Sequence, residues 1–197
     1  KLFKDNSPVL VVGSSWPPDI ELIANFYNDF PEKLKLIIAP HEIGEGKLEK
    51  TVDAFPKKKI IKFSEGEHKN PANYDILLID NIGMLSSLYH YGEYAYIGGA
   101  FGAGLHNTLE AATYGVPVFF GKKYNKFNEA VDLINLKGAF SVKDAEAFES
   151  IFLTMYNDKT LRNKTGKICS DYVMGHIGGT QKVIAYCKEK LIDAAAR

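Results

Sequence analysis

Cysteine is scarce in this sequence. The only two, Cys169 and Cys187, lie far apart, and no CxxC or Cys/His pattern surrounds either of them. This arrangement argues against a zinc site and gives no basis for inferring a disulfide. Reduced thiols, as in cytosolic proteins, are the simplest expectation. No other cluster of metal ligands is visible, so we expect neither a metal nor a cofactor.

An excess of either charge is also lacking, because 24 Lys and Arg residues balance 24 Asp and Glu residues. Nucleic-acid-binding domains usually carry a basic excess, so we expect no nucleic-acid partner. Long apolar runs are missing as well. No segment approaches the roughly 20 apolar residues that span a bilayer, and there is no signal peptide, so we expect a soluble chain.

The size and composition fit one globular domain. The chain has 197 residues, of which 46% are hydrophobic, enough for a core of its own. We therefore treat residues 1–197 as a single domain. Because the chain begins at Lys1 without a methionine, we expect it to be a fragment of a longer protein.

Short apolar runs alternate with segments of helical periodicity along the chain. This alternation is typical of α/β proteins with a doubly wound, Rossmann-like parallel sheet. We predict about six strands, with a possible short edge piece over residues 138–141. The six strands are expected over residues 8–13, 34–39, 59–63, 75–80, 93–97 and 116–120.

The unusual residues of the sequence follow these strands directly. In doubly wound sheets, ligands bind beyond the carboxyl ends of the strands. We therefore expect the loops there to converge on one crevice. These loops cover residues 13–16, 40–41, 82–84, 98–107 and 121–124.

The stretch GGAFGAG over residues 98–104 is the most distinctive of these loops. Glycines let a ligand approach the backbone, and a helix expected to begin near Leu105 or His106 would offer free N–H groups to an anion. The alternative is a tight turn with close helix packing. The dinucleotide fingerprint is absent after the first strand and the P-loop motif is absent throughout, so neither a standard NAD site nor a P-loop is supported.

Three polar residues share the start of that helix. His106 and Glu110 are spaced by one helical turn, and Asn107 lies beside them. Glu110 could accept hydrogen bonds from ribose hydroxyls, or it could simply favour the positive end of the helix dipole. The spacing alone leaves both interpretations open. His41, Trp16 and Lys123 are likewise either ligand contacts or ordinary surface and packing residues.

Taken together, these pieces resemble the C-terminal, donor-binding domain of the 3-deoxy-D-manno-octulosonic acid (Kdo) transferases of lipopolysaccharide synthesis. The likeness covers nearly the whole chain. It is strongest over residues 80–129, which read DNIGMLSSLYHYGEYAYIGGAFGAGLHNTLEAATYGVPVFFGKKYNKFNE. The family's run is similar to D-T-M-G-E-L, F-V-G-G-S, G-G-H-N-x-L-E-x-A, G-x-P-V and F-x-E, in that order.

The resemblance implies the C-terminal half of a GT-B glycosyltransferase that binds CMP-Kdo and inverts the anomeric carbon, with a lipid A precursor as acceptor. The family's Asn-x-x-Glu falls on Asn107 and Glu110, which implies contacts with the CMP moiety. Together with the glycine loop, the matched positions give a substrate site of Gly13, Ser14, Ser15, Pro40, His41, Ile82, Gly83, Met84, Gly98, Gly99, Gly104, His106, Asn107, Glu110 and Lys123.

Two positions depart from the family pattern. Met84 stands where the family usually has glutamate, and the arginine of the family's Pro-Arg-His is missing beside Pro40 and His41. These departures leave open a UDP-sugar glycosyltransferase or a sugar-nucleotide epimerase half, and a stand-alone nucleotide-binding module remains a further alternative. The family's catalytic carboxylate and membrane anchor lie in an N-terminal half. The resemblance therefore implies a full-length enzyme at the cytoplasmic face of the bacterial inner membrane, and a chain that is inactive by itself.

Overall fold

Seven strands form one sheet in the computed structural model, which describes residues 2–102 and 104–195. Every pairing is parallel, and the strand order is β3-β4-β2-β1-β5-β6-β7. The strands are β1 Val9–Ser15, β2 Lys35–Pro40, β3 Ile60–Lys62, β4 Ile76–Leu78, β5 Tyr94–Ile97, β6 Val118–Phe120 and β7 Ala139–Ser141. The predicted doubly wound sheet is confirmed. The predicted number of about six was one too low, because residues 139–141 pair with β6 as a full edge strand.

The central strands are mostly apolar because helices cover both faces of the sheet. In β1, Val9 to Val12 are fully buried, and so are the side chains of β5 and β6. Alternate residues of every strand except β3 belong to two separate cores. This two-sided burial explains why the strands appear in the sequence as unbroken apolar runs.

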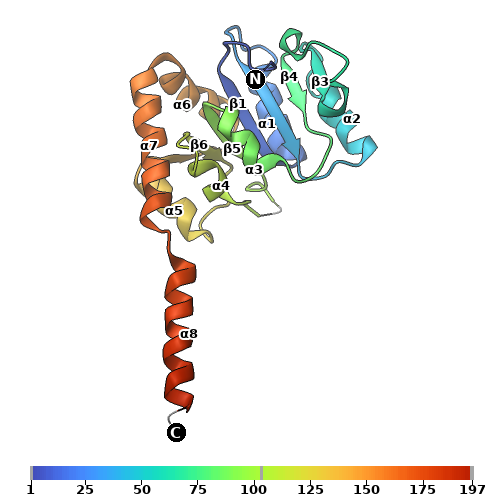
Figure 1. Cartoon of the computed structure of the whole chain (residues 1–197). Helices are drawn as coiled ribbons and strands as arrows, with labels where there is room; N and C mark the ends of the chain where they lie inside the picture. Colours follow the sequence, from blue (N-terminus) through green and yellow to red (C-terminus); the bar gives the residue numbers. More distant parts are fainter. Residues whose placement is uncertain (1, 103, 196–197) are drawn as a thin grey trace.

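Helices form a layer on each side of the sheet (Figure 1). One core contains side chains from α1 Pro17–Tyr27, α2 Glu45–Asp53 and α6 Ala145–Asn157. The other contains side chains from α3 Leu85–Leu88, α4 Thr108–Ala112, α5 Asn128–Asn135 and α7 Lys159–Gly175. Three short 3-10 turns complete the connections at Phe63–Glu65, Pro71–Asn73 and Tyr89–Tyr91.

The last helix, α8 Gly179–Ala195, extends away from the sheet (Figure 1). Met174 and Ile177 near its start, and Val183 within it, are more than half exposed. Within the described residues, no helix has both the length and the apolar character needed to cross a membrane.

The strand order reverses direction at β1. It pairs with β2 on one side and with β5 on the other. The loops after β1 and β5 therefore leave the sheet side by side, and the N–H of Gly98 donates to the carbonyl of Gly13 at 2.9 Å. In open α/β sheets such a switch point opens the crevice that holds ligands.

Helix α7 approaches the α4–β6 connection through a pair of glycines. A Cβ placed at Gly166 would lie 2.0 Å from the carbonyl oxygen of Gly115. We expect Gly166→Ala to lower the free energy of unfolding by about 2 kcal/mol, because the backbones would have to separate. Urea denaturation measures this change. Gly175→Ala in the same helix, where a Cβ meets nothing within 4 Å, should change stability by less than about 1 kcal/mol. Equal effects of the two substitutions would contradict the close approach.

Candidate functional site

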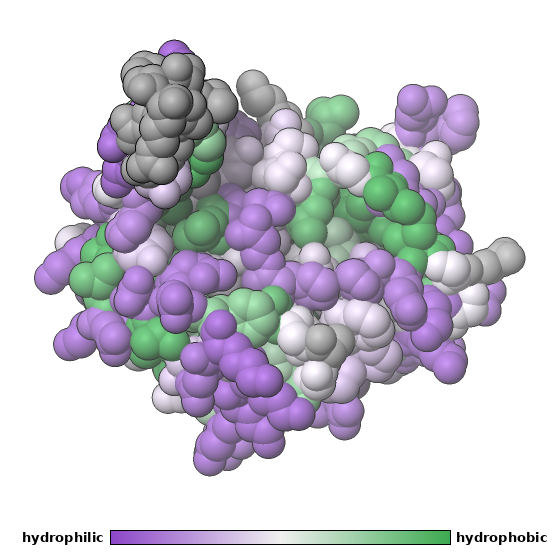
Figure 2. Space-filling model, turned by 90° about the horizontal axis from the view of Figure 1, so that it is seen from below, coloured by the Kyte–Doolittle hydropathy of each residue, from purple (hydrophilic) through white to green (hydrophobic). Residues whose placement is uncertain are grey.

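The predicted site residues lie at the carboxyl edge of the sheet. The loops after β1, β2, β4 and β5 emerge at the lower edge of the sheet in Figure 1, and Figure 2 views the molecule from below. On this face, polar side chains are interspersed with small apolar patches, so it presents no continuous apolar surface. Such a mixed surface suits a polar ligand.

Asp19 joins the two loops at the switch point, although the sequence analysis did not select it. Its side chain is fully buried. One carboxylate oxygen accepts the N–H groups of Trp16 and Gly99, each at 2.9 Å, and the other accepts the hydroxyl of Tyr96 at 2.9 Å. Burial raises the pKa of Asp19 above its usual value, and the three hydrogen bonds only partly offset that rise. A local signal did exist, since an acidic residue three positions after a helix N-cap often closes a capping box.

The glycines of the loop allow backbone to approach backbone. A Cβ at Gly98 would lie 2.2 Å from the carbonyl oxygen of Ser14, and Ser14 itself has φ 50°. Gly99 and Gly104 have φ values of +95° and +115°, which side chains rarely allow. The lack of side chains at these glycines therefore allows close backbone contacts within the protein.

Most of the N–H groups in this loop already have partners. Besides Gly99, which donates to Asp19, the N–H groups of Gly102 and Gly104 donate to the carbonyl of Gly99, and that of His106 donates to Gly98. A phosphate would therefore have to meet other donors. Ala103, which falls within the predicted loop, lies outside the described residues.

Helix α4 begins later than expected. The sequence predicted a start near Leu105 or His106, but the first helical residue is Thr108 and Asn107 is the N-cap. The Asn107 Oδ1 accepts the N–H of Leu109 at 3.0 Å, and its Nδ2 donates to Glu110 Oε1 at 3.1 Å. A helix of this length has only a small dipole, so it adds little attraction for an anion. Asn107 is exposed and Glu110 half-buried at this edge.

Trp16, His41 and His106 form an aromatic cluster that connects three loops. The indole of Trp16 stacks on His41 at 4.5 Å between ring centroids, and His41 lies 4.6 Å from His106. The indole N–H donates to His106 Nε2 at 3.1 Å. His41 and His106 were predicted to share the site, and here the loops after β2 and β5 meet through them.

The protonation of His106 is linked to this cluster. Its pKa lies below the usual value because of partial burial and because of His41 beside it, although Asp19 and Glu110 oppose the shift. Since Nε2 accepts the indole hydrogen, it must be unprotonated for the bond to form. Glu110 also raises the pKa of buried Tyr89, after the larger effect of burial, so Glu110 lies in electrostatic reach of both groups.

The loop after β4 holds Ile82, Gly83 and Met84. Gly83 has φ +94°, and Ile82 is 85% exposed. Met84 accepts a hydrogen bond from Asn81 through its sulfur at 3.1 Å. This loop connects to the rest of the site through α3 and the 3-10 turn that follows it, because the Leu85 and Tyr89 side chains occupy the space where a Cβ of Gly13 would lie.

Lys123 lies in the loop after β6, next to the glycine loop. Its N–H donates to the carbonyl of Ala100 at 2.8 Å, which holds the β6–α5 loop against the glycine loop, and its side chain is exposed. The ammonium group is therefore free to meet an anion in solution. Within the described residues, no three His, Cys, Asp or Glu side chains are grouped so that they could hold a metal ion.

Two cavities flank Trp16. The larger, of about 300 Å³, lies between α1 and α2 and includes Ser15 and Pro40 from the predicted site. The smaller, of about 190 Å³, is lined by Trp16, Pro18, Asp19, Gly99, Phe101 and Gly102. Asn107 and Glu110 line neither cavity. The sequence did not predict the larger cavity, because α2 contributes to it from a distant segment.

Comparison with known proteins places the chain. No protein-family model matches it. It is 32% identical over 142 residues to the 3-deoxy-D-manno-octulosonic acid transferase of Aquifex aeolicus, covering 68% of this chain and 38% of that protein. It is 26% identical to the Haemophilus influenzae transferase over an alignment of 199 positions, covering 96% of this chain and 46% of that protein. The chain belongs to the Kdo transferase family. It spans less than half the length of these two relatives.

Solved structures agree on the fold. The C-terminal CMP-Kdo binding domain of WaaA from Acinetobacter baumannii superposes with a TM-score of 0.75 at 22% identity, covering 88% of this chain and 92% of that one. The lipopolysaccharide glycosyltransferase WaaG superposes with a TM-score of 0.57 at 12% identity, covering 89% of this chain and 45% of that one. The present chain therefore has the fold of a GT-B C-terminal domain, as predicted.

Asp19 provides a test of how the switch point is held. We expect Asp19→Ala to lower the free energy of unfolding by about 3 kcal/mol or more, because buried donors of Trp16, Gly99 and Tyr96 lose their acceptor. Asp19→Asn should cost less, since its amide can accept from both N–H groups and donate to Tyr96. Chemical denaturation measures both. Asp144→Ala, which removes an exposed N-cap of α6, should cost about 1 kcal/mol, and a similar cost for Asp19→Ala would contradict the bridging role.

The difference in unfolding free energy between the unmodified chain and Asp19→Asn should depend on pH in a defined direction. The folded-state pKa of Asp19 is raised, so its contribution to stability is present at low pH and is lost as the pH rises through that pKa. Asp19→Asn removes this titration. The stability of the unmodified chain relative to Asp19→Asn should therefore increase as the pH falls.

His106 can be followed through the single tryptophan. Because Trp16 is the only tryptophan, its indole N–H gives one proton NMR resonance. We expect this resonance to move as His106 is protonated, with a midpoint below the usual value of about 6.5. His41→Leu should raise the midpoint, because the pKa of His106 is lowered by burial and, next, by the electrostatic effect of His41. An indole resonance that does not follow the titration of His106 would contradict the hydrogen bond.

Proposed function

We propose that this chain is the donor-binding half of an enzyme that transfers Kdo from CMP-Kdo to a lipid A precursor in lipopolysaccharide synthesis. The observation that supports this most is the position of Asn107 and Glu110. They lie at the open carboxyl edge of the sheet, next to the switch point where loops after β1, β2 and β5 meet. The family membership of the chain supports the choice of donor.

Glu110 would hold the ribose of CMP. Its carboxylate is half-buried, is oriented by a hydrogen bond from Asn107 and remains open at this edge. An anchored carboxylate can accept hydrogen bonds from both ribose hydroxyls, which makes it selective for a ribonucleotide. Asn107 would then position Glu110 as much as contact the donor itself.

The phosphate would meet cationic side chains more than backbone. The N–H groups of Gly99, Gly102 and Gly104 are engaged within the protein. The exposed side chain of Lys123 at the edge of the glycine loop offers positive charge in their place. Such charge stabilises the negative charge that develops on the departing CMP.

The rest of the enzyme would supply the chemistry at the acceptor. A general base from the N-terminal half would remove the proton of the acceptor hydroxyl, which then attacks the anomeric carbon with inversion. That half would also hold the lipid acceptor and associate with the cytoplasmic face of the inner membrane. Met84, which has no carboxylate, would contact the donor through its thioether alone.

Glu110→Ala tests the ribose contact. We expect it to weaken CMP binding by at least about tenfold, because hydrogen bonds to a charged group contribute about 1.5–3 kcal/mol. Isothermal titration calorimetry with CMP measures this loss, and UDP serves as the comparison ligand. Glu149→Ala, on exposed α6 surface, is the matched control and should leave the affinity unchanged.

Two results would count against the proposal. Equal CMP affinity in Glu110→Ala and the unmodified chain would remove Glu110 from the site. UDP binding more tightly than CMP would instead favour a UDP-sugar enzyme.

A further inference from the structure

One edge of the His106 ring is held by the protein itself. The indole N–H of Trp16 donates to His106 Nε2 at 3.1 Å. The neighbouring ring atom Cδ2 lies against the glycine loop, because a Cβ built on Gly99 would meet it at 3.0 Å. The edge that carries Nε2 and Cδ2 is therefore occupied. The opposite edge, which carries Nδ1 and Cε1, points away from both neighbours.

His41 packs against both partners of this hydrogen bond. Its ring stacks on Trp16 with 24° between the two ring planes, and it lies 4.6 Å from the His106 ring with 31° between the planes. The backbone of His41 is held as well, since its N–H donates to the carbonyl of Ser15 at 3.0 Å. One ring in a fixed position therefore limits how far Trp16 or His106 can tilt.

The backbone of Trp16 is fixed by the start of α1. Its N–H donates to the carboxylate of Asp19 at 2.9 Å, and its carbonyl accepts the N–H groups of Asp19 and Ile20. Backbone and ring are thus both held in place before any ligand arrives.

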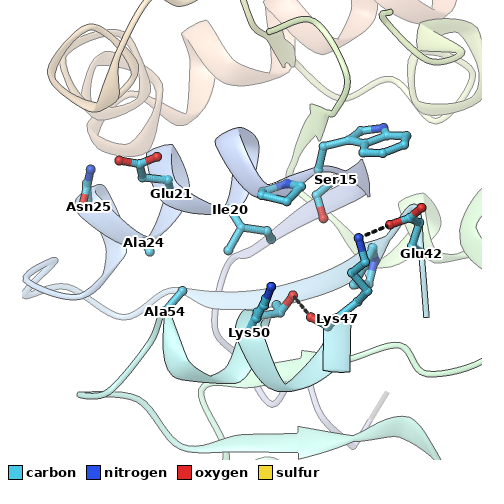
Figure 3. Close-up of a pocket in the computed structure, with 13 residues that line it drawn as sticks. Ser15, Ile20, Glu21, Ala24, Asn25, Glu42, Lys47, Lys50 and Ala54 are labelled. Atoms are coloured by element: carbon cyan, nitrogen blue, oxygen red, sulfur yellow. Dashed lines mark hydrogen bonds and ion pairs between the residues drawn. The ribbon is translucent and has the colours of Figure 1, made fainter. Parts of the chain in front are cut away.

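The larger cavity does not compete for the indole N–H. It lies between α1 and α2, with Ser15 and the Lys47–Glu42 ion pair at one end (Figure 3). Trp16 lines this cavity, but its indole N–H is bonded to His106. The hydrogen bond to His106, together with the stacking on His41, therefore orients the indole.

This arrangement determines the tautomer of His106. A neutral imidazole carries one hydrogen, on either Nδ1 or Nε2, and the other nitrogen is an acceptor. Because Nε2 accepts the indole hydrogen, the hydrogen of neutral His106 must be on Nδ1. Among the described residues, none forms a hydrogen bond with this Nδ1. His106 therefore presents an available N–H donor on the edge that points away from Trp16.

The groups around His106 favour its neutral form. Partial burial lowers its pKa most, and His41 after β2 lowers it further, while Asp19 on α1 and Glu110 on α4 oppose the shift. A cationic His106 would be attracted to Glu110 and would compete with a ligand hydroxyl for that carboxylate. A neutral His106 leaves Glu110 available to the ligand.

We propose that Trp16 is a positioning residue that holds His106 as a neutral Nδ1–H donor toward an acceptor oxygen of the ligand at the carboxyl edge of the sheet. An unconstrained imidazole samples both tautomers, and the Nε2–H form would turn a lone pair of Nδ1 toward that oxygen. The indole N–H disfavours this second form before the ligand binds. That the ligand is CMP-Kdo rests on the proposed function.

The tautomer of His106 in the free protein tests the first step. Long-range proton–nitrogen NMR spectra distinguish a protonated ring nitrogen from an unprotonated one. We expect the Nδ1–H form in the unmodified chain, and a mixture of tautomers in Trp16→Phe, which keeps a ring over His41 but has no N–H. His176 is the internal reference, because its Nδ1 lies 2.7 Å from the carbonyl of Tyr172 and must carry a hydrogen in both proteins. An Nε2–H His106 in the unmodified chain would overturn the proposal.

The titration of His106 gives a second readout in the same samples. The bond to the indole exists only while Nε2 is unprotonated, so it stabilises the neutral ring. Trp16→Phe should therefore raise the pKa of His106. An unchanged titration midpoint in Trp16→Phe would contradict the hold of the indole on this ring.

CMP binding tests the second step. At about pH 7.5, where His106 is neutral, Trp16→Phe should weaken CMP binding at least about twofold, because only part of the population then carries the hydrogen on Nδ1. In a His106→Ala background the same substitution should have no further effect, since the two residues act as one unit. Isothermal titration calorimetry measures both affinities.

Tyr172→Phe is the matched control for these measurements. It removes a polar hydrogen from an aromatic ring that lies beside His176, between α5 and α7 and outside the candidate site. It should leave both the tautomer of His106 and the affinity for CMP unchanged.

The results separate this inference from the proposed function. Equal CMP affinity in Trp16→Phe and the unmodified chain, or an equal loss with and without His106, would overturn the positioning role and leave the proposed donor in place. A chain that holds His106 in the Nδ1–H form but does not bind CMP would overturn the proposed donor and support the control of His106 by Trp16.

Discussion

The carboxylate of Asp19 is the interaction on which the candidate site depends. It lies fully buried between the loops that follow β1 and β5, and it joins them through N–H groups separated by more than eighty positions in the sequence. A buried carboxylate is costly unless donors surround it, and here three donors do. Because the two loops are held to the same atom, residues that follow them, such as Trp16 and His106, are held near each other as well.

The glycine loop positions the site through contacts within the protein more than it binds a ligand. Gly98 and Gly99 leave room for Ser14 and Gly104, and their N–H groups complete bonds inside the protein. Recognition of a ligand therefore depends on side chains at the edge of the sheet, namely those of Glu110, Lys123, His41 and His106. The glycines of this loop suggested a phosphate site in the sequence. In the structure they position that site, but their N–H groups are not its hydrogen-bond donors.

The sequence predicted the strands and the edge at which the site residues lie, because unbroken apolar runs and strand-end loops are local features. It also predicted Asn107 and Glu110 as partners, since their spacing is that of one helical turn. It could not predict the Asp19 bridge or the stacking of Trp16 on His41, because those contacts join distant segments. The start of α4 was misplaced because Asn107 caps the helix with its own side chain, which periodicity does not reveal.

Trp16 lies between the candidate site and the larger cavity. One edge of its indole bonds to His106, which lies electrostatically close to Glu110, and its side chain also lines the cavity that contains Ser15 and Lys50. A ligand that alters the position of the indole on one side must alter the His106 bond on the other. The protonation state of His106 and the occupancy of the cavity are therefore expected to be coupled, since linkage between two equilibria that share one element acts in both directions.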